Sequence, residues 1–309
     1  MKIITLTLNP AFDMHCFTKN FEPFCENLAE ITALEAGGKG VNISRALTSL
    51  GVENKALVVL GKDNGDSFRR ALLDDGIDCA FVEVDGRIRE NITLHTTSSP
   101  ETRISFRGFS ADSSLLRRVC DALDGEIDSD TVLTFTGSLP TGISIDDARK
   151  MLLKMKTKGA RIVIDSRSFR LDDIKAVRPW LIKPNEEEIA LYSSLAVTDL
   201  ESAATAAEEL RKSCAENVMI SLGGAGAVLA CEDGIFSAKA PSIEVLSTIG
   251  AGDSSIAGFI AAAKERLPYS EMLRHAIAYG SAACMSSGTR PPEKSNVTML
   301  LEEVVVEKK

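Results

Sequence analysis

The sequence predicts an α/β fold with a mostly parallel sheet, helices on both of its faces, and a small additional β-sheet. Two observations carry this prediction. Short apolar runs alternate along the chain with longer amphipathic runs, which is typical of strands and helices that follow one another in α/β proteins. Two other segments alternate polar and apolar residues one by one, which indicates strands with one solvent- or ligand-facing side.

The predicted strands of the main sheet are the short runs rich in Ile, Leu and Val. They cover residues 3–8, 56–60, 132–135, 162–164, 181–182, 218–222, 227–230 and 243–246. The first predicted helix follows Gly40, because apolar residues recur three and four positions apart up to Leu50, and Gly51 can end it. Further helices are predicted over residues 144–158, 199–213, 253–266 and 270–287.

The two segments of alternating residues cover 11–35 and about 88–109. They predict strands of a small sheet outside the main one, which is either a lid over a ligand or a solvent-facing extension. Residues 302–309 are highly charged and are expected to fray. No long linker interrupts the pattern, so residues 1–309 are expected to form one domain.

Composition and charge narrow the function classes. The 309 residues carry 44 acidic and 35 basic side chains, a net charge of −9, which disfavours nucleic acid and anionic membranes as partners. No run reaches the roughly 18 apolar residues of a membrane span, and the N-terminal apolar run is too short for a signal peptide. Seven cysteines without regular spacing indicate reduced thiols, so we expect a cytoplasmic protein without a Cys/His metal site.

The first candidate site is the cluster Gly37-Gly38-Lys39-Gly40, directly before a predicted helix. Glycines let a ligand approach the backbone, and the N–H groups and dipole of a helix N-terminus attract phosphate. Lys39 adds a full positive charge. Gly40 stands where a Walker A loop has Ser or Thr, so the loop is of another type. Taken alone, the cluster fits a phosphate site and a plain tight turn equally well.

The second candidate site is Gly250-Ala251-Gly252-Asp253, which opens another predicted helix. Its small residues can present N–H groups to an oxyanion, and Asp253 can accept a proton from a hydroxyl. The alternative is that Asp253 is an ordinary N-cap.

Two further clusters are weaker signals. Lys183, Asn185 and Glu188 follow a predicted strand. The side-chain oxygens of Asn185 and Glu188 suit magnesium near phosphates, but acids in a first helical turn are also explained by the helix dipole. The turn from Ser221 through Gly223 to Gly226 leads into a strand rather than a helix, which argues against a nicotinamide-binding dehydrogenase. The histidines, His15, His95 and His275, show no pattern that would make them catalytic partners.

Together these motifs resemble the phosphofructokinase B group of the ribokinase-like carbohydrate kinases, over essentially the whole chain. The motifs that carry the resemblance occur in family order, at 5–13 (TLTLNPAFD), 37–42 (GGKGVN), 137–140 (GSLP), 183–185 (KPN), 221–223 (SLG) and 250–253 (GAGD). The first two are most similar to the branch of 1-phosphofructokinases and tagatose-6-phosphate kinases. The resemblance implies a Rossmann-like sheet with a small β lid that often forms a dimer contact.

The resemblance also implies residue roles on the nucleotide side. Asp253 would be the general base, with Gly250, Ala251 and Gly252 as the anion hole. Asn185 and Glu188 would organise Mg²⁺. The residues around the nucleotide would be Lys183, Asn185, Ser221, Gly223, Gly226, Gly250 and Gly252. ATP would be the phosphoryl donor, and a requirement for a monovalent cation such as K⁺ stays open.

On the acceptor side, the resemblance implies a sugar that already bears a phosphate. The residues that would bind it are Asp13, Gly37, Gly38, Lys39, Asn42, Arg89, Asn91, Arg103 and Ser138. Asp13 would hold sugar hydroxyls and Lys39 would neutralise the sugar's phosphate. Thr93 is a departure, because related 1-phosphofructokinases have Lys there. Arg103 and Arg107, four residues apart on a predicted strand, either supply the missing charge or are surface residues.

We therefore expect a kinase that converts fructose 1-phosphate to fructose 1,6-bisphosphate and forms a homodimer through the lid. The alternatives are a tagatose-6-phosphate kinase or 6-phosphofructokinase and, in a different class, a non-catalytic sugar-phosphate sensor. The two catalytic features at 250–253 disfavour the sensor.

Overall fold

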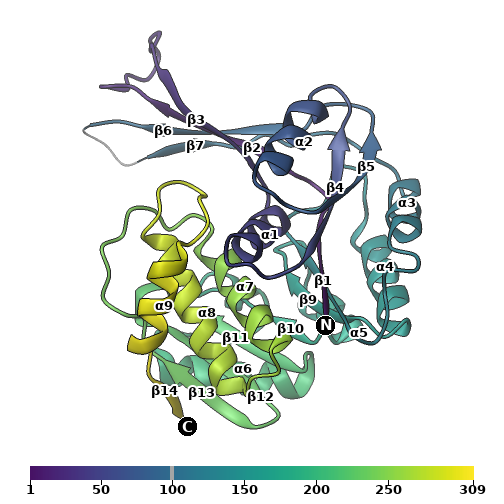
Figure 1. Ribbon diagram of the computed structural model, residues 1–309, viewed down its shortest axis with the longest axis vertical. Coiled ribbons are helices and arrows are strands. Elements are labelled where there is room, and N and C mark those ends of the chain that lie inside the picture. Colours follow the sequence, from purple (N-terminus) through teal and green to yellow (C-terminus); the bar gives the residue numbers. More distant parts are fainter. Residues whose placement is uncertain (98–100) are drawn as a thin grey trace.

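The computed structural model describes residues 1–97 and 101–309, which form a large sheet with helices on both faces and a small sheet that projects from it (Figure 1). The predicted α/β class with a second, smaller sheet is confirmed. The predicted segment 88–109 includes residues 98–100, which lie outside the described residues.

The large sheet has the strand order β14-β13-β12-β11-β10-β9-β8-β1-β4-β5. From β5 to β11 all neighbouring strands are parallel, whereas β11 to β14 are antiparallel. Its strands are β1 (Lys2–Thr7), β4 (Lys55–Gly61), β5 (Cys79–Val84), β8 (Thr131–Thr136), β9 (Arg161–Asp165), β10 (Leu181–Ile182), β11 (Asn217–Ser221), β12 (Ala227–Cys231), β13 (Gly234–Ala238) and β14 (Val306–Lys308). Parallel strands place their carboxyl ends at one edge, where ligands bind in such folds.

Helices cover both faces of this sheet, and each face has its own apolar core. The first core packs under α2 (Gly65–Asp74), α3 (Ser114–Ala122), α4 (Ile145–Thr157), α5 (Leu171–Val177) and α6 (Leu200–Ser213). The second packs under α1 (Lys39–Ser49), α7 (Ala251–Lys264), α8 (Tyr269–Cys284) and α9 (Lys294–Glu303). Two short 3₁₀ turns, Glu188–Leu191 and Gly223–Ala225, follow β10 and β11.

The small sheet has the order β3-β2-β6-β7 and extends away from the body (Figure 1). Its strands are β2 (Ala11–Phe17), β3 (Glu30–Gly37), β6 (Arg89–His95) and β7 (Thr102–Ile104). Strand β2 follows β1 closely, and β3 leads directly into α1. The base of the small sheet is therefore tied to the carboxyl edge of the large sheet.

The structure corrects several details of the sequence prediction. The C-terminal residues do not all fray, because β14 pairs with β13 and completes the sheet edge. Residues 243–246 are not a strand; they form part of an extended loop in which the Leu246 N–H donates to the Cys284 carbonyl. Strand β7 ends at Ile104, so Arg107 does not share a strand face with Arg103. Helices α2, α3, α5 and α9 were not predicted.

In the part of the chain that the structure describes, no helix combines the length and apolar character needed to cross a membrane.

Candidate active site

A cavity of about 1,110 Å³ opens at the carboxyl edge of the large sheet, between the body and the base of the small sheet. Its walls combine the ends of β1, β8, β9, β10 and β11 with the N-termini of α1 and α7. Cavities of roughly 300–1,000 Å³ hold typical small ligands, so this one has room for two. It contains all the predicted site residues except Gly37.

Gly37 lies just outside the cavity wall and has a packing role. A side-chain carbon at this position would stand 2.3 Å from Oδ2 of Asp13, so only glycine leaves room for the Asp13 carboxylate. The prediction that Gly37 contacts the ligand thus has no support in the cavity geometry.

Two helix N-termini meet in this cavity. Helix α1 begins after Gly38 (φ 122°) and α7 after Gly250 (φ 78°), and both backbone conformations favour glycine. Neither helix has a side-chain cap, so its first N–H groups are available to an anion. Asp253 is the third residue of α7 rather than its N-cap, so the alternative interpretation of Asp253 is wrong.

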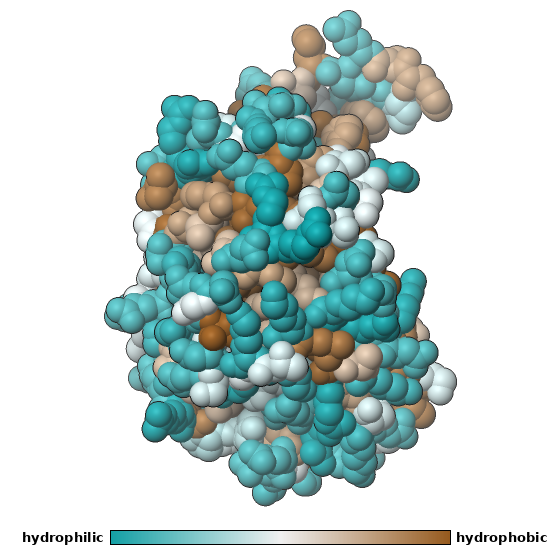
Figure 2. All heavy atoms as spheres, turned by 90° about the vertical axis from the view of Figure 1, so that its right-hand side faces the viewer, coloured by the Kyte–Doolittle hydropathy of each residue, from teal (hydrophilic) through white to brown (hydrophobic). Residues whose placement is uncertain are grey.

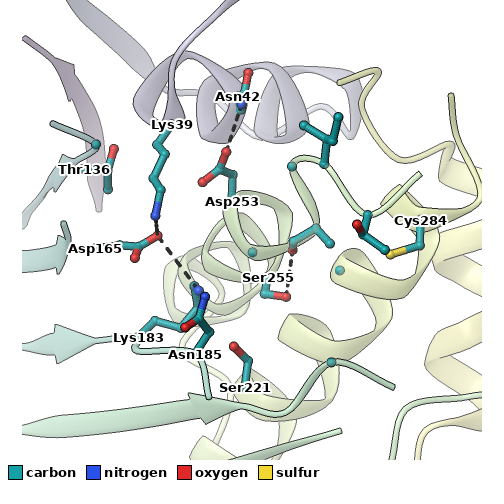
Figure 3. A pocket seen from close by; sticks show the side chains of 18 of the residues that line it. Lys39, Asn42, Thr136, Asp165, Lys183, Asn185, Ser221, Asp253, Ser255 and Cys284 are labelled. Atoms are coloured by element: carbon teal, nitrogen blue, oxygen red, sulfur yellow. Dashed lines mark hydrogen bonds and ion pairs between the residues drawn. The ribbon is translucent and has the colours of Figure 1, made fainter. Parts of the chain in front are cut away.

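Asp253 is a buried carboxylate at the centre of the cavity wall, with a relative exposure of 6%. Asn42 on α1 donates from Nδ2 to its Oδ2 at 2.9 Å, as Figure 3 shows. Burial, reinforced by the nearby Asp165, raises the pKa of Asp253 to about 6, although Lys39 opposes the shift. An ionised, oriented carboxylate with one oxygen free suits a general base near neutral pH.

A second buried carboxylate, Asp165 at the end of β9, holds two lysines. Lys39 Nζ donates to its Oδ2 at 3.0 Å, and Lys183 Nζ lies 3.9 Å from the same oxygen (Figure 3). Although burial works against both charges, the lysines hold the pKa of Asp165 below its usual range, and Asp165 raises the pKa of Lys39. Asp165 therefore fixes both amino groups near Asp253.

Asn185 and Glu188 face the cavity after β10 and hold each other in place. The Glu188 N–H donates to Oδ1 of Asn185 at 2.8 Å, and the Asn185 N–H donates to Oε2 of Glu188 at 3.2 Å. Arg167 donates from Nε to Oε1 of Glu188 at 2.9 Å. The carboxylate is thus oriented by the protein alone.

The remaining predicted residues line two sides of the cavity. Ser221, Gly223 and Gly226 form the turn between β11 and β12. Ser138 follows β8 and accepts a hydrogen bond on Oγ from Asn9 at 3.0 Å.

On the small-sheet side, Asp13 accepts a hydrogen bond from Asn91 Nδ2 at 2.9 Å, and burial raises the pKa of Asp13. Arg89 and Arg103 also line the cavity. Arg107 is exposed and is not part of the wall. Of the two arginines proposed to replace a lysine at Thr93, only Arg103 is in position.

The small sheet is also joined to the C-terminal part of the chain. The Glu35 carboxylate on β3 accepts a hydrogen bond from the Thr289 N–H at 3.0 Å and another from the Thr289 hydroxyl. Thr289 follows α8, which lines the cavity with Ile277, Ser281 and Cys284.

Sequence reasoning missed Asp165, Arg167 and His15. A signal existed for Asp165, because an acid directly after a buried parallel strand lies at the ligand-binding edge. For Arg167 and His15 the signal is tertiary, since their partners lie 21 and 80 positions away.

Comparison with known proteins agrees with this geometry. The family profile of the pfkB family carbohydrate kinases matches residues 11–296. The chain belongs to this family. A family relative, the 1-phosphofructokinase of Escherichia coli K12, is 33% identical over 98% of this chain and 97% of its own length. The ATP-dependent 6-phosphofructokinase isozyme 2 of the same strain is 29% identical over 94% of each chain.

The fold comparison points to the same family. A crystal structure of phosphofructokinase-2 from Escherichia coli in complex with potassium matches with a TM-score of 0.90 and 27% identity, over 98% of each chain.

Proposed function

We propose that this protein is an ATP-dependent kinase of a phosphorylated ketohexose, and that fructose 1-phosphate is its acceptor. The observation that carries the proposal is the buried Asp253, fixed by Asn42 at a helix N-terminus beside two lysines. The higher identity to a 1-phosphofructokinase than to a 6-phosphofructokinase favours fructose 1-phosphate. The product would be fructose 1,6-bisphosphate.

In this proposal Asp253 is the general base. Its free carboxylate oxygen takes the proton of the acceptor's C6 hydroxyl. At the same time the sugar's C6 oxygen forms a bond to the γ-phosphorus of ATP, and the bond between that phosphorus and the leaving ADP breaks. Asn42 restrains Oδ2, so the proton transfer falls to Oδ1. A positioned base of this kind contributes roughly 10²–10⁴ in rate.

The charge that develops on the transferring phosphoryl group would be held by the N-terminus of α7. The N–H groups of Gly250, Ala251 and Gly252 have no side-chain cap to satisfy them. Lys183 stands beside this turn, since a side-chain carbon on Gly252 would lie 3.1 Å from its Nζ. Phosphoryl transfer needs such positioning and charge neutralisation more than covalent help from the protein.

The residues fit a magnesium ion carried by the nucleotide. Among the described residues no cluster of three or more His, Cys, Asp or Glu forms an all-protein metal cage. Mg²⁺ keeps several waters and binds through one or two carboxylates plus substrate phosphates. Glu188 and Asn185 supply such oxygens at the cavity wall, and Mg²⁺ there would neutralise phosphate charge. Because a structure of a relative contains potassium, we include K⁺ as a second cation to test.

The small sheet would act as the lid of the site and as a dimer contact. Its outer surface carries large apolar side chains, and Figure 2 shows hydrophobic atoms on the projecting part of the molecule. The exposed residues of the small sheet and its adjoining loops are Phe17, Phe21, Phe24, Leu28, Ile31, Leu34, Ile104 and Phe106. Exposed apolar surface on a thin sheet favours burial against a second copy. All seven cysteines are free, which supports a cytoplasmic location.

The test is ADP release from Mg-ATP with fructose 1-phosphate, fructose 6-phosphate, tagatose 6-phosphate and free fructose as acceptors. Asp253→Asn, purified in parallel, measures contaminating activity. A preference for fructose 1-phosphate supports the proposal. A preference for fructose 6-phosphate or tagatose 6-phosphate would make that sugar the acceptor in place of fructose 1-phosphate. If no acceptor is turned over, the result favours a sugar-phosphate sensor.

A further inference from the structure

A second, small recess opens off the acceptor side of the main cavity. It measures about 70 Å³ and lies between β2, β6 and β7 of the small sheet and the residues Ile249 and Thr289. It shares Asp13, Asn91 and Arg103 with the main cavity, so a single ligand in the acceptor site can extend into the recess.

The recess contains a buried histidine with an unused ring nitrogen. His15 on β2 has a relative exposure of 7%, and its Nε2 is buried without a hydrogen-bond partner among the described residues. Such an atom normally has a partner, because a buried polar group without one destabilises the fold by about 1–3 kcal/mol. A ligand that accepts a hydrogen bond would supply the missing partner.

The other ring nitrogen of His15 is already used. His15 Nδ1 lies 3.1 Å from Nε2 of His95, and the two rings stack at 5.4 Å with an interplanar angle of 11°. When His95 donates to Nδ1, the proton of a neutral His15 stands on Nε2, in a side chain that lines the recess. His95 Nδ1 is in turn 3.9 Å from the Glu101 carboxylate.

The same wall supplies further donors for an anion. Arg103 on β7 lines the recess, and its Nε is 3.0 Å from the same Glu101 carboxylate. Thr93 and Ser105 add hydroxyl groups. Thr93 is the direct neighbour of His15 in the parallel pair of β2 and β6, so its hydroxyl adjoins the imidazole.

We infer that His15 binds the phosphate group that the acceptor sugar already carries, together with Arg103, and that His95 is the positioning residue that directs its proton into the recess. This inference rests on the proposed function, because it assigns a subsite of the same cavity.

Several charged or titratable groups face this histidine pair. They are Asp13, Glu35, Arg89, Glu101, Arg103 and the second histidine itself. Asp13 accepts a hydrogen bond from Asn91 and lies near the positive charge of Arg89, and Glu35 accepts a hydrogen bond from Thr289. These contacts reduce the repulsion between the two carboxylates and a bound phosphate.

The experiment compares His15→Gln with the control His275→Gln. His275 lies on α8, where its Nδ1 contacts the Glu271 carbonyl, away from both cavities. We expect His15→Gln to raise KM for the sugar phosphate about 10- to 100-fold, the range for a charge-assisted hydrogen bond. KM for ATP and turnover of free fructose should stay within two-fold of wild type, roughly the effect of an uninvolved surface change.

Two further variants distinguish a binding role from a structural one. His95→Gln should raise the same KM by a smaller factor. The double variant His15→Gln/Thr93→Lys should regain affinity, because a lysine at the neighbouring strand position restores a charged donor to the same wall. An unchanged KM in His15→Gln, or an equal rise for ATP, overturns the inference.

Calorimetric titration with sugar phosphate and with inorganic phosphate, without nucleotide, separates this inference from the proposed function. If wild type turns over no acceptor, the proposed function fails. In that case a loss of phosphate binding in His15→Gln, with normal binding in His275→Gln, supports the subsite, and equal binding in both overturns it.

Discussion

The carboxyl edge of the large sheet and the base of the small sheet differ in how their polar groups are partnered. At the carboxyl edge the charged side chains hold each other, as in the contacts of Asp165 with Lys39 and of Asp253 with Asn42. In the small sheet, His15 Nε2, Arg89 Nε and Asn91 Oδ1 are buried without partners among the described residues. The charged groups of the edge are therefore oriented by the protein itself, although the neutral atoms Thr7 Oγ1, Asn9 Oδ1 and Thr136 Oγ1 there also lack partners among the described residues. The small sheet differs because a histidine and an arginine nitrogen are among its unpartnered atoms.

This difference has a physical reason. A catalytic group must be aligned at the moment of reaction, so its orientation is fixed in the free protein. A specificity site gains discrimination from groups that only the correct ligand can satisfy, because a wrong ligand leaves them unpaired. Variants at the edge should therefore reduce turnover, and variants in the small sheet should reduce acceptor affinity.

The largest effect is expected for Asp253→Asn. The amide keeps the shape and the neighbourhood of Asn42 but cannot accept the proton, so kcat should fall by about 10²–10⁴. Steady-state kinetics should show an acceptor KM within a few-fold of wild type. Near-normal turnover would remove Asp253 from the role of base.

Lys39→Ala should have the next largest effect, because it removes a charge from the cavity and leaves buried Asp165 with Lys183 as its nearest cation. If Lys39 neutralises the sugar's phosphate, KM for the sugar phosphate should rise about 10- to 100-fold and KM for ATP much less. Equal increases for both substrates would instead place Lys39 at the transferring phosphoryl group.

The pH profile offers a third test of the preorganised edge. Asp253 must be ionised to act as a base, and burial raises its pKa to about 6. Acceptor kcat/KM should therefore fall as the pH drops below about 6, approaching tenfold per pH unit. A carboxyl in water titrates near 4, so a profile that stays flat down to pH 5 would contradict this environment. The residual activity of Asp253→Asn should lack this decline.

The smallest effect is expected for Arg167→Gln. Arg167 is largely exposed, and its charge faces Glu188, so removing it should strengthen divalent cation binding a few-fold through reduced repulsion. Titration of Mn²⁺ followed by electron paramagnetic resonance, without turnover, measures this directly. Arg211→Gln, which breaks an ion pair with Glu208 on α6, is the matched control and should leave Mn²⁺ binding unchanged.

The edge and the small sheet also differed in how well the sequence predicted them. Motifs such as Gly250 to Asp253 combine a turn, a helix start and a chemical group within four residues, so local reasoning places them correctly. The helices predicted after residue 140 agree with the structure within three residues. These edge motifs were predictable because their signals are short in sequence, whereas Asp165 and Arg167 at the same edge belong to no such motif and were missed.

The small sheet depends on pairings between distant strands. His15 and His95 are close together only because β2 and β6 are parallel neighbours in one register. The sequence of neither strand indicates which strand it pairs with. Arg103 and Arg107 were assigned to one strand by their spacing, but β7 is too short to contain both. Tertiary pairing and strand length, which single-sequence patterns do not encode, account for both misses.

The contact between Glu35 and Thr289 makes the position of the small sheet depend on a residue near the C-terminal end of the chain. A protease cut after α8, or a truncation before Thr289, would remove the donors that hold β3, although neither change touches the lid itself. The two positions, 254 residues apart, are also expected to vary together among relatives, since a carboxylate at one is useful only with a donor at the other.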